Sequence, residues 1–226
     1  MHSNEREIVA LKIARSQQYF NKLSLFFYDA LLYGVISKYA WGSSTARLDA
    51  HYARYATANH LEVGVGTGYL LDRVRFCKTP RLALMDLSSQ CLAATAHRVA
   101  RHAPACHVQN ILEPVTQQIA PFDSISVNYV MHCVPGDFKK KGIAFVHLAA
   151  LIAPAGTLFG TTVLSQDVPK NLLARPFMWL MNALGVFNNR ADSASDLAAS
   201  LRAHFQVVQF DIVGVTAFFA IRSDKH

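Results

Sequence analysis

The sequence predicts a doubly wound α/β fold, in which helices cover both faces of a mainly parallel β-sheet. From about residue 60 onward, short apolar or β-branched runs alternate with segments of helical period. The run Leu82–Met85 is continuously apolar, which is typical of a strand covered on both faces, as in parallel sheets. The last two runs are separated only by Gly214, so we expect them to form an antiparallel pair that closes one edge of the sheet.

Seven runs are expected to be strands. In chain order they are His60–Val65, Arg81–Leu87, His107–Leu112, Phe122–Val130, Thr157–Leu164, Gln206–Val213 and Val215–Arg222. Ser88 is a good N-cap for a helix that ends before Pro104, because a serine hydroxyl accepts a hydrogen bond from the first helical turn. Residues Phe138–Ile152 are expected to form one further helix, which Pro154 ends.

Two segments fall outside this alternation. Residues 1–59 have helical period and many aromatic side chains, and residues 165–192 form an apolar insertion after the fifth expected strand. We therefore predict an N-terminal helical cover over residues 1–59. The remaining residues, 60–226, are expected to form a core that carries the insertion at about 165–192.

Composition excludes several classes of protein. The 226 residues are 52% hydrophobic and 16% charged, which favours one domain with a sizeable core and excludes bulk disorder. The four cysteines include no CxxC pair, so neither a zinc ribbon nor a disulfide framework is indicated, and we expect a reducing, cytoplasmic setting. The apolar stretch Leu23–Ile36 contains Asp29 and is shorter than the roughly 20 residues of a membrane span, so we expect a soluble protein.

The strongest local signal is a glycine-rich loop where the first strand turns into a helix. It reads Leu61-Glu62-Val63-Gly64-Val65-Gly66-Thr67-Gly68-Tyr69. A dinucleotide-binding loop requires glycine where Tyr69 stands, and a phosphate loop requires lysine followed by serine or threonine, which is absent. What remains is an acid, Glu62, two residues before the first of three alternating glycines, and this carboxylate needs a polar partner if its strand is buried.

In this motif the sequence resembles the class I S-adenosylmethionine-dependent methyltransferases, whose first motif has the form (D/E)xGxGxG. The resemblance continues at Asp86, which ends the second strand, and at Asn110, which follows the third and replaces the usual aspartate. It extends to the run Phe122–Val130 and to the stretch Leu151–Leu158, which is similar to the LxPGGxL segment of the family. The resemblance implies a Rossmann-like, seven-stranded sheet with an antiparallel edge strand.

The resemblance also implies S-adenosylmethionine as the cofactor and a set of residues that bind it. The expected cofactor-binding residues are Glu62, Gly64, Gly66, Gly68, Asp86, Leu87, Asn110, Ile111 and Asn128. In the family the acid that matches Asp86 takes the two ribose hydroxyls, and the position of Asn110 faces the adenine amino group. The amide oxygen of Asn110 is able to accept from that amine.

Candidate catalytic residues follow the fourth strand. Methyl transfer depends mainly on alignment of donor and acceptor, and some acceptors also need a base. A neutral His132 is one candidate base, and the alternative is that His132 packs within its loop. Tyr129 is the second candidate, and the alternative is that it lines the pocket.

Aromatic and apolar side chains of the two covers are candidates for the acceptor site. The expected substrate-binding residues are Tyr19, Tyr28, Tyr33, Trp41, Phe177, Trp179 and Met181. The alternative is that these side chains form buried helix faces, as apolar residues at helical spacing commonly do. An insertion placed after the fifth strand favours an apolar wall at the pocket mouth.

The patterns together predict methylation of a small, aromatic or apolar metabolite of secondary metabolism. The net charge of +7 leaves nucleic-acid methylation as an alternative, but no Asn-Pro-Pro-aromatic signature follows Asn128. For that alternative a basic edge would be formed by Arg73, Arg75, Lys78, Arg81, Arg98 and Arg101, and a second basic cluster by the lysine run Lys139–Lys141. Such runs of charge are more commonly solvated helix surfaces. A second alternative is a protein that uses the cofactor-binding fold without methylating. We expect no metal site, because His97, His102 and His107 are spaced five apart, which does not place them on one helical face.

Overall fold

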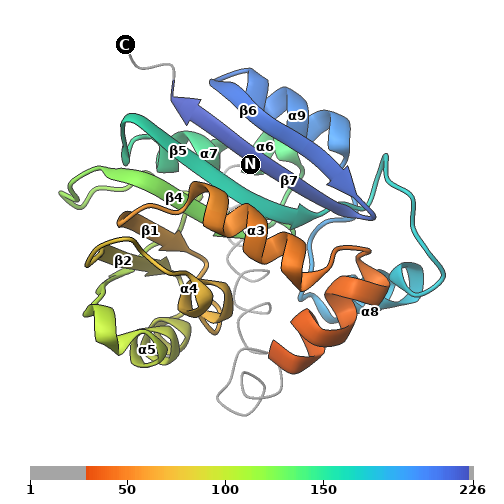
Figure 1. Ribbon diagram of the computed structural model, residues 1–226. Helices are drawn as coiled ribbons and strands as arrows, with labels where there is room; N and C mark the ends of the chain where they lie inside the picture. Colours follow the sequence, from red (N-terminus) through yellow and green to blue (C-terminus); the bar gives the residue numbers. More distant parts are fainter. Residues whose placement is uncertain (1–28, 224–226) are drawn as a thin grey trace.

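Seven strands form one sheet, in the order β3-β2-β1-β4-β5-β7-β6. The protein was analysed as a computed structural model that describes residues 29–223 (Figure 1). The elements in the described residues are η1 (Ala30–Ala40), α3 (Thr45–Tyr55), β1 (Asn59–Val63), α4 (Tyr69–Arg73), β2 (Arg81–Asp86), α5 (Ser89–Arg98), η2 (Ala100–His102), β3 (Ala105–Val108), β4 (Phe122–Asn128), α6 (Phe138–Lys141), α7 (Ile143–Ala149), β5 (Ile152–Val163), α8 (Ala174–Leu184), α9 (Ala194–Arg202), β6 (Phe205–Val213) and β7 (Thr216–Ser223). The predicted α/β fold is confirmed.

Strands β1 to β5 pair in parallel, and β7 runs antiparallel to both β5 and β6. The last two strands form the predicted antiparallel pair, with β6 outermost and β7 one position inside the edge. Their turn contains Gly214 at φ +59°, and a Cβ there would lie 2.2 Å from the backbone oxygen of Trp41. Glycine is therefore required at this turn, both for the left-handed backbone and for the close approach.

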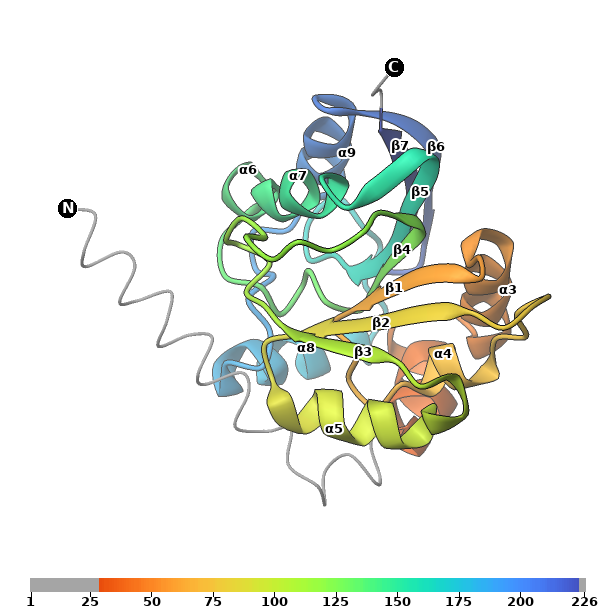
Figure 2. The ribbon, with the colours of Figure 1, turned by 90° about the vertical axis from the view of Figure 1, so that its left-hand side faces the viewer.

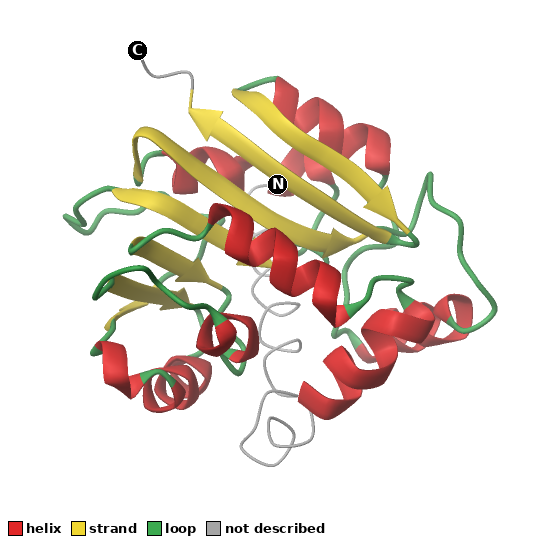
Figure 3. Cartoon of the chain, viewed as in Figure 1, coloured by secondary structure: helices red, strands yellow, loops and turns green. Residues whose placement is uncertain are grey.

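Helices cover both faces of the sheet, as expected for parallel strands (Figure 2, Figure 3). On one face α6, α7 and α9 bury an apolar cluster that includes Phe138, Phe145, Leu148, Leu197 and Leu201, packed on Leu61, Ile125 and Leu158 of the strands. On the other face η1, α3, α4, α5 and α8 bury a second cluster that includes Ile36, Tyr52, Leu71, Leu92 and Met178, packed on Leu84 and Phe159. The alternation is clear in β2, where Ala83 and Met85 face the first cluster and Leu82 and Leu84 face the second.

The helix after β2 begins as predicted, and the helix after β4 differs from the prediction. The Ser88 hydroxyl accepts from the backbone N–H of Cys91 at 3.2 Å and caps α5, which ends at Arg98. The single helix expected over 138–152 is wrong, because α6 and α7 are separated at Gly142. A Cβ at Gly142 would lie 2.1 Å from Ser200 Oγ of α9, so α9 passes directly against this break. Pro154 lies inside β5.

The described part of the N-terminal cover consists of η1 and α3. Helix η1 has the wider π-type winding over eleven residues and lies beside α8. Just before α8, Asn171 Nδ2 donates to the backbone oxygen of Tyr39 at 2.9 Å. Two of the predicted substrate-binding residues, Tyr19 and Tyr28, lie outside the described residues. Among residues 29–223, no helix has both the length and the apolar character needed to span a bilayer.

Candidate functional site

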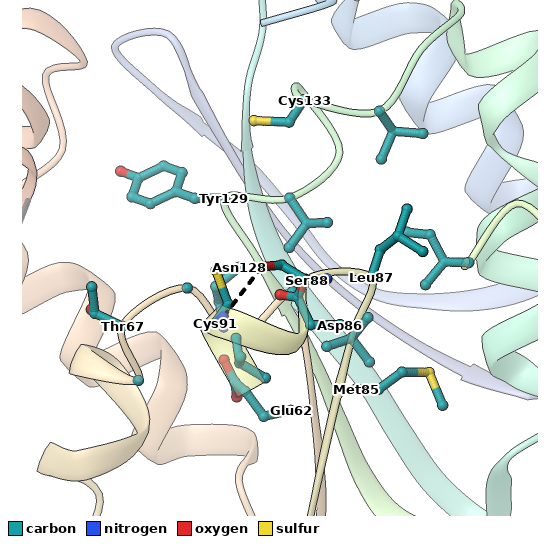
Figure 4. Close-up of a pocket in the computed structure, with 18 of the residues that line it drawn as sticks. Glu62, Thr67, Met85, Asp86, Leu87, Ser88, Cys91, Asn128, Tyr129 and Cys133 are labelled. Carbon is teal, nitrogen blue, oxygen red and sulfur yellow. Dashed lines mark hydrogen bonds between the residues drawn. The ribbon is translucent and has the colours of Figure 1, made fainter. Parts of the chain in front are cut away.

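A cavity lies beyond the carboxyl ends of β1, β2 and β4, next to the point where the strand order reverses. Ligands of doubly wound sheets bind at this position. Residues 62–70, 85–88, 109–112, 128–130 and 133–135 line the cavity, together with Cys91 of α5 and with Leu32 and Tyr33 of η1. Glu62 and Asp86 lie at one end, and Tyr129 and Cys133 at the other (Figure 4).

The glycine loop places its backbone directly at the cavity. Gly64 has φ +67°, and a Cβ there would lie 2.2 Å from Val130 Cγ2, so the loop after β4 packs against the bare backbone. Gly66 has φ +52°, and a Cβ there would meet no atom of the described residues within 4 Å. Open space above a bare backbone is what a closely bound ligand requires. Gly68 precedes α4, which has only five residues.

Glu62 is buried at the cavity wall, with 4% of its surface exposed. Its Oε2 accepts hydrogen bonds from the hydroxyls of Tyr52 in α3 and Ser126 in β4. His60 Nε2 lies 3.3 Å from the same oxygen. A buried carboxylate needs polar partners, and the sequence did not predict these three. Their one signal in the sequence is that His60 and Ser126 are polar side chains inside otherwise apolar strands.

Asp86 ends β2 with its carboxyl group at the cavity. Its Oδ1 accepts from the backbone N–H of Ser88 at 2.8 Å. Burial raises the pKa of Asp86, and backbone N–H groups that include those of Ser88 and Val65 oppose this rise because they stabilise the ionised form. The result is a carboxyl group held in a fixed orientation with acceptor capacity toward the cavity.

The segment after β3 also lines the cavity, but β3 is shorter than predicted and ends at Val108. Asn110 Oδ1 accepts from the Leu112 N–H at 3.0 Å, and Asn110 Nδ2 donates to Glu113 Oε1 at 3.1 Å. The Asn110 side chain therefore closes the turn that shapes this wall. The neighbouring Ile111 is 9% exposed and adds an apolar surface.

Asn128, the last residue of β4, carries a buried donor that lacks a partner. Its Oδ1 accepts from Thr161 Oγ1 at 3.2 Å, whereas its Nδ2 makes no hydrogen bond to any described residue. A buried amide without an acceptor costs about 1–3 kcal/mol. Because Asn128 lines the cavity, a bound ligand with an acceptor atom there would satisfy it. Together with the open space at Gly66, this donor fits a site built for a polar cofactor.

The two candidate catalytic residues differ in position. Tyr129 lines the cavity in a left-handed backbone conformation, with φ 55°, and its hydroxyl lies 3.3 Å from Ser37 Oγ of η1. Burial raises the pKa of Tyr129. His132 is 4% exposed, does not line the cavity, and accepts from the Val163 N–H through Nδ1 at 3.4 Å. Burial lowers the pKa of His132 to about 3, so this imidazole is a poor proton acceptor near pH 7.

Of the predicted substrate-binding residues in the described region, Tyr33 alone lines the cavity. Its ring stacks on Tyr69 at 4.2 Å between centroids. Trp41 is 1% exposed and packs against Phe177 at 5.4 Å, outside the cavity lining. Trp179 is 67% exposed, and Met181 packs at the margin of the apolar cluster beneath α8.

Contacts from the start of η1 to the glycine loop and to α5 hold η1 at the cavity. Asp29, at the start of η1, accepts from the Thr67 hydroxyl in the glycine loop and pairs with Arg98 of α5 at 2.7 Å. Tyr69, Leu32 and Cys133 also line the cavity and were not predicted. Burial raises the pKa of Cys133 to about 12. The thiol therefore keeps its proton and lines the cavity as an apolar group, since only the thiolate is a good nucleophile.

Comparison with known proteins agrees with this site. A family model described as "Methyltransferase domain" matches residues 61–158. Demethylluteothin O-methyltransferase from Streptomyces thioluteus is 37% identical over 204 residues, which cover 90% of this chain and 89% of that protein. Methyltransferase aurB from Calcarisporium arbuscula is 34% identical over 225 residues, covering 93% and 98%. The solved structure of N-methyltransferase NodS from Bradyrhizobium japonicum WM9 with S-adenosyl-l-homocysteine has a TM-score of 0.57 at 16% identity, covering 80% and 89%, and shares the fold.

A seven-stranded sheet with this glycine loop and this cavity defines a cofactor-binding α/β enzyme. The relatives that are 37% and 34% identical over 90% and 93% of this chain show which family of such enzymes it belongs to. The chain belongs to the class I S-adenosylmethionine-dependent methyltransferases, and S-adenosylmethionine is its cofactor.

Proposed function

We propose that the protein transfers a methyl group to a hydroxyl oxygen of a small, aromatic or apolar metabolite of secondary metabolism. The observation that carries this proposal is the cavity, whose end away from Glu62 and Asp86 is walled by aromatic and apolar side chains. Tyr129 and Cys133 lie at that end (Figure 4), and the Tyr33 ring, which stacks on Tyr69, lies 6.5 Å from the Tyr129 ring between centroids. Oxygen as the acceptor atom is supported by the name of the relative from Streptomyces thioluteus.

The residues at the other end would hold the cofactor, which supplies a sulfonium-bound methyl group. We propose that Glu62 and the loop Gly64–Gly68 hold its methionine part, and that Asp86 accepts from the ribose hydroxyls with Leu87 beside it. Asn110 and Ile111 would flank the adenine. The free Nδ2 donor of Asn128 would then find its acceptor on the bound cofactor.

The acceptor end acts mainly by orientation and by exclusion of water, which supply most of the gain in an in-line displacement. His132 lies behind the cavity wall with its pKa lowered to about 3, so we do not retain it as the base. Tyr129 keeps its proton, because burial raises its pKa, and its ring shapes the wall. We infer that the acceptor hydroxyl is more acidic than the Tyr129 phenol, as enols and acidic phenols are, and that it gives its proton to solvent as it enters the site.

Surface charge gives little support to the alternative of a nucleic-acid substrate. Several members of the predicted basic edge are already paired with acids, namely Arg73 with Asp49, Arg98 with Asp29 and Arg101 with Asp72. In the predicted lysine cluster, Lys141 is fully buried against Asp192. Paired and buried cations bind phosphate weakly, because their charge is compensated.

The test is a methyl-transfer assay with radiolabelled S-adenosylmethionine. We expect label in phenolic and enolic small molecules offered as a panel, and none in total RNA or duplex DNA. The methyl ethers of the same molecules, which lack a free hydroxyl, serve as matched controls and should remain unlabelled. Label in RNA, or label in the methyl ethers, would contradict the proposal.

A further inference from the structure

The two oxygens of the Glu62 carboxylate have different environments. Tyr52 and Ser126 both donate to Oε2, and His60 Nε2 lies 3.3 Å from it. Within residues 29–223, no hydrogen bond reaches Oε1, which nevertheless remains accessible at the cavity wall. One oxygen is therefore occupied by the protein, and the other is left for a ligand.

The hydrogen bonds around Glu62 show where the Tyr52 proton lies. The single Tyr52 hydroxyl proton is donated to Glu62, so that hydroxyl accepts from His60 Nε2 at 2.9 Å. The other ring nitrogen, His60 Nδ1, lies 2.7 Å from the Ser124 hydroxyl oxygen. Burial and the charge of Glu62 both raise the pKa of Tyr52 well above its ordinary value, which keeps the proton on this hydroxyl as the donor to Glu62.

Tyr52 reaches Glu62 from a different part of the fold. It lies in α3, is 1% exposed, and packs edge-on against Phe159 of β5 with ring centroids 5.4 Å apart. The packing of its ring on Phe159 and the hydrogen bond of its hydroxyl to Glu62 together hold the Tyr52 hydroxyl in one place. The orientation of the carboxylate therefore depends on how α3 packs on the sheet.

We propose that Tyr52 is a positioning residue, which turns Glu62 so that Oε1 receives the ammonium group at the methionine end of the cofactor, directly or through one water. A charge that is already oriented needs no reordering when the ligand binds, so the interaction contributes fully to affinity. This inference rests on the proposed role of Glu62 and adds the residue that makes it effective.

The test is Tyr52→Phe, measured by titration calorimetry with two ligands. S-Adenosylhomocysteine carries the amino-acid group, and 5′-methylthioadenosine lacks it. We expect affinity for S-adenosylhomocysteine to fall roughly 5- to 30-fold, with the affinity for 5′-methylthioadenosine unchanged. Equal losses for both ligands, or wild-type affinity for both, would overturn the proposal.

A matched control lies one turn further along the same helix. The Tyr55 hydroxyl donates to Gln209 Oε1 of β6 at 2.7 Å, and Tyr55 does not line the cavity. Tyr55→Phe removes the same atom from the same helix and should leave both affinities unchanged. Should Tyr52→Phe fail to fold, Ser126→Ala removes another donor to Oε2 and should show a smaller loss with the same preference. Equal effects of Ser126→Ala on both ligands would reject the inference.

These measurements need no methyl acceptor, so they separate this inference from the proposed function. Loss of selectivity for the amino-acid group in Tyr52→Phe supports the positioning role, whatever substrate the enzyme methylates. Failure of the acceptor panel with intact binding of S-adenosylhomocysteine would instead reject the proposed acceptor class alone.

Discussion

The open space above Gly66 makes Gly66→Ala a direct test of where the cofactor lies. A Cβ at Gly66 would meet no atom of residues 29–223 within 4 Å, so the substitution causes no clash within the described part of the fold. Its one intrinsic penalty is the left-handed backbone at φ +52°, about 1–2 kcal/mol. For a chain of this size that lowers Tm by roughly 2–8 °C. The new methyl group would occupy the space assigned to the cofactor, and an overpacked contact costs about 1–3 kcal/mol.

We therefore expect Gly66→Ala to remain folded and to bind S-adenosylhomocysteine roughly 5- to 150-fold more weakly. Titration calorimetry measures the affinity, and a melting curve followed by circular dichroism measures the stability. Gly64→Ala is the contrasting variant, because a Cβ there would lie 2.2 Å from Val130 Cγ2 and so mainly destabilises the fold. Wild-type affinity in folded Gly66→Ala would refute the placement of the cofactor against this loop.

Three further measurements test other parts of the site and core. Asp86→Ala should weaken binding of S-adenosylhomocysteine by about 1–3 kcal/mol, and an unchanged calorimetric affinity would remove Asp86 from the cofactor site. Lys141→Met leaves the fully buried Asp192 without its cation and should reduce the free energy of unfolding by about 3–5 kcal/mol. Urea denaturation measures this loss, and a wild-type midpoint would contradict it. Burial lowers the pKa of His51 to about 4 and of His132 to about 3, so below pH 6.5 the unfolded chain binds protons that the folded chain excludes. Stability should therefore fall by roughly 1.4 kcal/mol per pH unit for each histidine as the pH drops from 6.5 toward those values, and equal urea midpoints at pH 7 and 5.5 would refute this.

Local chemistry explains which parts of the site were predictable. The glycine loop and Asp86 are recognisable because a tight turn and a strand-end carboxylate are encoded by adjacent residues. Both line the cavity, as the resemblance implies. That Asn110 faces the adenine stays a prediction, and in the structure its side-chain oxygen and nitrogen both form hydrogen bonds within its own turn.

Long-range packing explains what was missed. The helical spacing of aromatic residues in segments 1–59 and 165–192 did not show which rings line the cavity. Tyr33 lines it, whereas Trp41 is buried elsewhere and Trp179 is exposed. The period of a helix identifies a face but not the element against which that face packs. In the same way, a run of lysines typical of a solvated surface contains Lys141, which pairs with Asp192, 51 residues away in the chain.

The amino-acid sequence by itself determined the α/β class, the strand content and the glycine loop that lines the cavity, because these depend on residue period and on turn geometry between neighbours. Only the tertiary structure decided which oxygen of Glu62 has no hydrogen bond to the described residues, which aromatic rings line the cavity, and which charges are buried. Those properties arise where α3, η1 and the strands converge. No local pattern specifies such contacts, since each one is formed by side chains that folding brings together from separate segments of the chain.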